Sequence, residues 1–98
     1  MNFLKKLGVS SDVIQELPKK YEPGVLNNAL LDEKKIVEAI VFLKANGFTN
    51  LNNLVLYNFT FLFLGKKKIY ETLEKVGLEQ AISEMNKDIK YLDKIMKV

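Results

Sequence analysis

Apolar residues recur along much of this chain with the three- to four-residue period of an α-helix. The clearest case runs from Glu33 to Asn46, where they stand at i, i+3, i+4 and i+7 and are followed by Gly47. The apolar positions are Ile36, Val37, Ile40, Val41 and Leu43. This pattern predicts a helix over residues 33–46 with the whole stripe buried, Asp32 as its N-cap and Gly47 as its end.

The same period predicts further short helices on both sides of this one. Their expected ranges are 3–7, 10–17, 25–31 (a short helix or a 3₁₀ turn), 49–58, 66–76 and 79–97. Ser10 is the expected N-cap of the second helix, and Pro18 is its expected end. The last helix carries a narrow apolar seam that favours packing against one neighbouring helix, with a coiled-coil dimer as the alternative. The seam consists of Ile82, Met85, Ile89, Leu92 and Met96.

The segment from Leu56 to Leu64 combines two conflicting patterns. Its aromatic residues alternate as they do in a β-strand. They are Tyr57, Phe59, Phe61 and Phe63. The chain offers no second strand to pair with, and an isolated strand is not stable. We therefore expect a helix that ends near Asn58, followed by a compact 3₁₀ or extended connector buried in the core.

One short sequence motif occurs three times: a lysine-bearing helix end, a glycine and a large apolar residue. It spans residues 4–9, 43–48 and 73–78. A glycine in this place ends a helix in the left-handed conformation, so we expect positive φ at Gly47 and Gly77. Repetition at this spacing is typical of stacked helical repeats. We expect one all-α domain over residues 1–98, a small right-handed stack of about five to six short helices in two to three degenerate repeats with a C-terminal closing helix.

The order helix, glycine, apolar residue, polar cap, short helix and apolar connector resembles the helical repeat of the mitochondrial transcription termination factor family. Residues 3–37, 42–69 and 73–98 correspond to three such units, the third reduced to a terminal helix. The resemblance implies a nucleic-acid-binding architecture. The second unit has Asn58-Phe59-Thr60 where the family has a proline-led turn, and no binding residue transfers one for one.

Composition removes most catalytic chemistry. The 98 residues include no cysteine, histidine, tryptophan or arginine, so thiolate and imidazole groups are absent as nucleophiles, general bases and zinc ligands. The acidic residues stand at helical spacing beside lysines, which is typical of a solvated surface. We expect a protein that is not an enzyme and has no cofactor or metal.

Lysine clusters are the first candidate binding residues. The run Lys66, Lys67 and Lys68 stands at the start of a predicted helix, where the dipole is already positive. It is a candidate phosphate contact, or a solvated run that protects the apolar neighbour from aggregation. Lys34 and Lys35 form one of several further pairs that would join it if the helices stack with the lysines on one face.

The aromatic segment is the second candidate. Tyr57, Phe59, Phe61 and Phe63 are expected to fill the core, with an exposed patch for a protein partner as the alternative. The leading function is a small non-enzymatic interaction module that binds a protein partner or forms a homodimer. The alternative is a nucleic-acid-binding module whose lysines contact phosphates without distinguishing bases, because the chain has no arginine to read guanine. The net charge of only +3 places this alternative second.

Cellular placement follows from composition alone. Residues 1–7 carry two lysines without the apolar run of a signal peptide, and the apolar stretch 59–64 is too short for a bilayer. We expect a cytoplasmic protein without a membrane partner. The richness in Lys, Asn and Ile without Arg suits an AT-rich bacterial genome.

Overall fold

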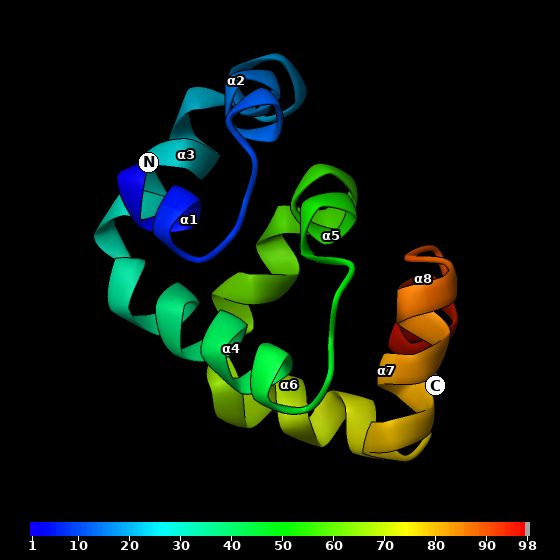
Figure 1. The fold of residues 1–98 in the computed structure, drawn as a ribbon. Coiled ribbons are helices and arrows are strands. Elements are labelled where there is room, and N and C mark those ends of the chain that lie inside the picture. Colours follow the sequence, from blue (N-terminus) through cyan, green and yellow to red (C-terminus); the bar gives the residue numbers. More distant parts are fainter. Residues whose placement is uncertain (98) are drawn as a thin grey trace.

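The computed structural model describes residues 1–97 as short helices joined by tight turns (Figure 1). These residues contain no strand, so the all-α prediction is confirmed. The elements are α1 (Asn2–Lys6), α2 (Ser11–Lys20), α3 (Pro23–Leu31), α4 (Glu33–Ala45), α5 (Leu51–Asn58), the 3₁₀ helix η1 (Phe59–Leu64), α6 (Gly65–Glu74), α7 (Leu78–Lys87) and α8 (Tyr91–Met96). Val98, the last residue of the expected third unit, lies outside the described residues. The described residues form eight α-helices and one 3₁₀ helix, more than the expected five to six, and the last predicted helix is divided in two.

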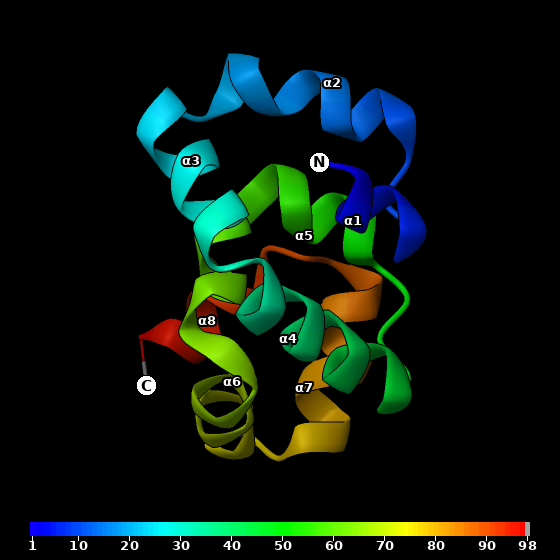
Figure 2. The same cartoon turned by 90° about the vertical axis from the view of Figure 1, so that its left-hand side faces the viewer.

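Helix α2 lies at one end of the molecule and helices α6 and α7 lie at the other, as both views show (Figure 1 and Figure 2). Between these ends α4 packs against α6 and η1, while α5 packs against α2 and η1. The C-terminal helices α7 and α8 pack against α6 and against each other. None of the helices in residues 1–97 combines the length and the apolar character that a membrane span needs.

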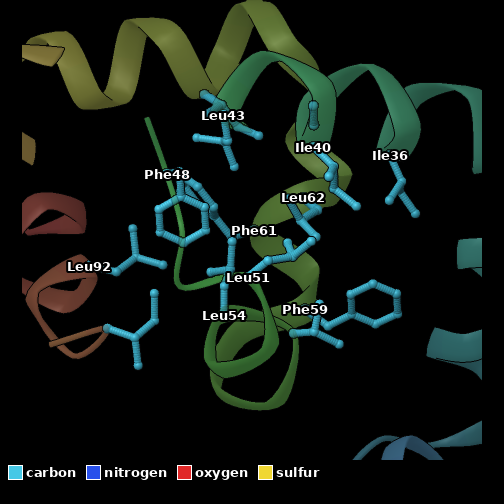
Figure 3. Packing of buried hydrophobic residues seen from close by; sticks show 14 of the residues in the cluster. Ile36, Ile40, Leu43, Phe48, Leu51, Leu54, Phe59, Phe61, Leu62 and Leu92 are labelled. Carbon is cyan, nitrogen blue, oxygen red and sulfur yellow. The ribbon is translucent and has the colours of Figure 1, made fainter. Parts of the chain in front are cut away.

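The core is built around the inward face of α4. Ile36, Ile40 and Leu43 are fully buried and point toward η1 and α5 (Figure 3). Their spacing of four and three residues keeps them on one side of the helix, as the sequence predicts. Val41, expected in the same stripe, is instead 52% exposed. It stands one residue after Ile40, and a step of about 100° around the helix turns it away from the core.

The aromatic segment forms the buried 3₁₀ helix η1, which confirms the predicted connector. Phe59 and Phe61 are 0% and 2% exposed, and the rings of Phe59 and Phe63 meet edge to face at 5.3 Å. The Tyr21 hydroxyl accepts a hydrogen bond from the Phe59 N–H at 3.0 Å. Because η1 lies among α4, α5 and α6, its apolar side chains fill the space between them instead of pairing with another strand.

Glycines with positive φ end three of the helices, which confirms the expectation for Gly47 (φ 90°) and Gly77 (φ 103°). Gly8 has the same conformation, with φ 102°. After Gly47 the Phe48 N–H donates to the Leu43 carbonyl at 3.0 Å, which folds the apolar residue back onto the last turn.

We expected Pro18 to end the second helix, and this prediction is wrong: Pro18 lies inside α2. The proline removes one backbone donor, yet the Tyr21 N–H still bonds the Leu17 carbonyl at 2.9 Å and closes the last turn. Burial of Val13 and Leu17 stabilises the helix on the core side. The N-cap prediction is confirmed, since the Ser10 hydroxyl accepts the Val13 N–H at 3.3 Å.

The predicted single helix over residues 79–97 is also wrong. Asp88 adopts an extended conformation between α7 and α8, and its carboxylate accepts the Lys90 N–H at 3.0 Å. This side-chain bond replaces a helical one and lets the chain turn back toward α5. Four seam residues are buried within the chain, whereas Met96 is 47% exposed. A seam buried in this way cannot pair with a second copy.

Candidate functional site

A groove of about 600 Å³ lies between α4 and the beginning of α6. Its lining residues are Lys35, Glu38, Phe42, Leu64, Gly65, Lys66, Lys67 and Tyr70. The floor is apolar: the rings of Phe42 and Tyr70 meet edge to face with centroids 6.1 Å apart. Tyr70 is 44% exposed, so much of this aromatic pair is open to solvent.

The groove exists because α4 is apolar on more than its inward face. Ile36, Ile40 and Leu43 are covered by the core, but Val41 and Phe42 lie on the flank beside α6. α6 contacts α4 but leaves this flank partly open. This exposed apolar flank is therefore a candidate surface for a ligand or partner.

Lysines from both helices border the apolar floor. The ammonium group of Lys66 lies 6.0 Å from the centroid of the Phe42 ring, which is within cation–π range. The aliphatic part of Lys35 crosses Gly65, where a Cβ atom would lie 2.8 Å from the Lys35 Cε. Gly65 has φ +85°, a conformation that favours glycine, and any larger residue there would also displace the Lys35 side chain.

The groove continues along α4 in both directions. Toward α3 it is lined by Leu31, Asp32 and Lys34, and toward the end of α4 by Val37, Val41 and Ala45. Glu38 borders all three parts, so they form one continuous surface. From position 31 to position 45 this surface runs for about 20 Å, at about 1.5 Å for each helical residue.

Positive charge predominates along this surface. Lys34, Lys35, Lys66 and Lys67 border it, against the carboxylates of Asp32 and Glu38. The ion pairs seen within residues 1–97 are Lys19–Glu16 and Lys87–Glu84, so none of these four lysines is neutralised by a carboxylate of that part of the chain. Their charge is therefore available to a ligand.

The structure brings together four of the five lysines predicted as phosphate contacts. Lys68 is the exception: it is exposed but does not line the groove. Two steps of about 100° carry it around α6 from Lys66. The lysine pairs at positions 5–6 and 19–20 belong to α1 and α2 and also do not line the groove.

The four aromatic residues considered as a partner patch do not form one surface. Phe59 and Phe61 are buried, Phe63 is half-buried and Tyr57 is 39% exposed. The Tyr57 hydroxyl donates a hydrogen bond to the Asp93 carboxylate, and this bond joins α5 to α8. The alternative of an exposed aromatic patch does not hold for Phe59 and Phe61, because these two rings fill the core.

The exposed apolar residues of the groove were missed by the sequence analysis. They are Leu31, Val41 and Tyr70, exposed by 83%, 52% and 44%. One signal was present, since Val41 and Phe42 widen the apolar stripe of α4 beyond the face that one neighbouring helix covers.

Within the described residues, no three Asp or Glu side chains lie close enough to hold a metal ion. Comparisons with protein-family models, with curated proteins and with solved structures found no match for the chain.

Proposed function

We propose that this protein is a non-enzymatic interaction module that binds an acidic, partly apolar segment of a partner protein in the α4/α6 groove. The observation that carries the proposal is the coincidence of exposed apolar side chains with lysines that have no ion pair within residues 1–97. Apolar contacts would provide affinity, and the lysines would select partners of opposite charge.

A protein segment suits the groove better than a nucleic acid does. Phosphate backbones require cations but make no use of an exposed Leu31 or Val41. The carboxylates of Asp32 and Glu38 would also face those phosphates. Binding of a nucleic acid through these lysines is therefore the second candidate function, after binding of a protein segment.

Self-association through the same groove is disfavoured by charge. Two copies meeting groove to groove around a two-fold axis would place like patches opposite each other. Each surface carries more lysines than carboxylates, so bringing the two together costs free energy unless counter-ions intervene. An acidic partner meets no such repulsion.

We also propose that the chain is built from degenerate, right-handed repeats like those of the mitochondrial transcription termination factor family. Support comes from two turns with matching hydrogen bonds. Val9 N–H bonds the Leu4 carbonyl and Phe48 N–H bonds the Leu43 carbonyl, each at 3.0 Å. The next residue of each turn donates its N–H to an asparagine of the following unit: Ser10 to Asn52 at 2.9 Å, and Thr49 to Asn86 at 2.8 Å.

Selection of binding peptides from a random display library tests the proposed function. Enriched peptides should bind the wild-type chain and shift the backbone amide resonances of α4 and α6. Val41→Ser and Tyr70→Ala should each weaken binding about tenfold, because each removes exposed apolar area from the groove. Met96→Ser is the matched control, since Met96 is comparably exposed (47%) but does not line the groove.

Three results would overturn the proposal. The first is enrichment of no peptide, or of peptides that bind elsewhere. The second is a stable dimer, measured by light scattering, that buries the groove. The third is tight binding of a random duplex or single strand whose salt dependence is flattened by replacing Lys66, Lys67 and Lys68 with Gln.

A further inference from the structure

We infer that the groove accepts its partner segment as an amphipathic α-helix of about four turns, with carboxylates facing the lysines and a neutral or basic residue facing Glu38. This inference rests on the proposed function and adds the conformation and charge pattern of the segment. It follows from the shape of the groove, its apolar floor and the positions of its charges.

The shape of the groove favours a helix. The residues that α4 contributes stand at positions 34, 35, 37, 38, 41, 42 and 45, and all but Val37 share one straight face of the helix. A straight surface of about 20 Å matches about 13 residues of a second helix. An extended segment would bring unpaired backbone groups against helical walls that offer no sheet edge, whereas a helix satisfies its own.

The apolar floor defines where the segment is anchored. Phe42, Leu64 and Tyr70 line the part beside the start of α6, whose volume of about 600 Å³ admits a large side chain such as Leu, Phe or Trp. Val41 and Ala45 extend the apolar surface beyond it. A helix that carries apolar residues at i, i+3 or i+4, and i+7 would contact both regions along one face.

The charges define which residues flank that face. Lys35, Lys66 and Lys67 surround the anchor position, so carboxylates beside the anchor side chain would meet cations from both helices. Glu38 stands in the middle and borders every part of the groove. A carboxylate directly opposite Glu38 would be repelled, so the pattern selects an acidic helix that is interrupted at one position.

Synthetic peptides of about 16 residues test the inference, because they span the groove with one residue or more to spare at each end. The first peptide has Leu or Phe at helical spacing, flanked by Glu. The second has Lys in place of every Glu. The third has the composition of the first, with the apolar residues rearranged to alternate. The first should bind, shift the α4 and α6 amides and gain helical circular dichroism, and the other two should bind about tenfold more weakly or worse.

Charge variants of the protein sharpen the test. Combining Lys35→Glu with Lys66→Glu should reverse the preference, so that the Lys peptide binds better than the Glu peptide. Combining Lys19→Glu with Lys20→Glu, on α2, changes the net charge equally and should leave the preference unchanged. Glu38→Gln should strengthen binding of a peptide with Glu at every flanking position about threefold, by removing one repulsion.

The experiments distinguish failure of the helical-segment inference from failure of the proposed function. If library-selected peptides bind the groove but gain no helix, or are bound equally well by the double variant Lys35→Glu, Lys66→Glu, the inference is overturned and the interaction module stands. Equal binding of the first and third peptides would also overturn it. If no peptide of any kind contacts the groove, both proposals fail.

Discussion

The Tyr21 hydroxyl lies at the point where α5 changes into η1 and accepts the Phe59 N–H at 3.0 Å. Its own proton is directed at the carbonyls of Val55 and Leu56, at 2.9 and 3.1 Å. The rings of Tyr21 and Phe59 also contact each other, with centroids 5.9 Å apart. One side chain, at the residue that follows α2, therefore holds the backbone of the junction in place.

Tyr21→Phe should lower the free energy of unfolding by about 1–3 kcal/mol, because the partly buried Phe59 N–H and two carbonyls lose their partner. Denaturant unfolding followed by circular dichroism measures the change. Tyr70→Phe is the control, since its exposed hydroxyl makes no hydrogen bond within residues 1–97, and it should change stability by less than about 0.5 kcal/mol. Equal effects of the two variants would contradict the assigned role of Tyr21.

Gly47→Ala should destabilise the fold by about 1–2 kcal/mol through backbone strain alone. No atom lies within 4 Å of the added Cβ, and φ is +90°. Gly24→Ala is the matched change at an open position in α3 without left-handed φ. It should stabilise by about 0.4–1 kcal/mol, because alanine loses less entropy on folding. A loss of stability at both glycines would refute this assignment.

Phe61→Ala should cost about 3–5 kcal/mol, because its ring is 2% exposed and its removal leaves a cavity. Phe63→Ala, two residues later and half-buried, should cost clearly less. Phe61→Leu keeps most of the volume and provides a measurable variant if the alanine form fails to fold. A larger loss for Phe63→Ala than for Phe61→Ala would show that the wrong ring was assigned to the core.

The hydrogen bond to Asp93 raises the pKa of Tyr57 above its usual value of 10.0, with smaller contributions from desolvation and from the charges of Asp93 and Asp88. The unfolded chain lacks this contact, so the stabilisation is present at neutral pH and is lost as the pH rises through the folded-state pKa. Asp93→Asn should bring the pKa down toward 10.0, as NMR titration of the Tyr57 ring would show. An unchanged pKa in that variant would contradict the contact.

Local signals in the sequence account for most of the helix positions. Gly47 and Gly77 adopt the predicted φ because only glycine occupies that conformation without strain. The change from α5 to η1 near Asn58 was also predictable, since an unpaired aromatic strand has no stable place in a helical domain. These features depend on a few neighbouring residues.

The features that were missed depend on distant parts of the chain. The path of α2 through Pro18 depends on burial of Leu17 in the core, which outweighs the loss of one donor. The break at Asp88 is accompanied by contacts of α8 with α6 and by the Tyr57–Asp93 bond. Whether Val41 or Ile40 faces the core depends on where the other elements pack against α4, and spacing along the sequence leaves this open.

Asn86 both accepts the Thr49 N–H at 2.8 Å and donates to the Gly47 carbonyl at 2.9 Å. Among short side chains, only an amide presents an acceptor and a donor side by side in this way. Aspartate would lose the donor and place a negative charge against the carbonyl, while leucine would leave both backbone groups to solvent and break the link between α7 and the turn at Gly47. In the evolution of this protein, most exposed positions of α7 should therefore vary, whereas position 86 should retain asparagine.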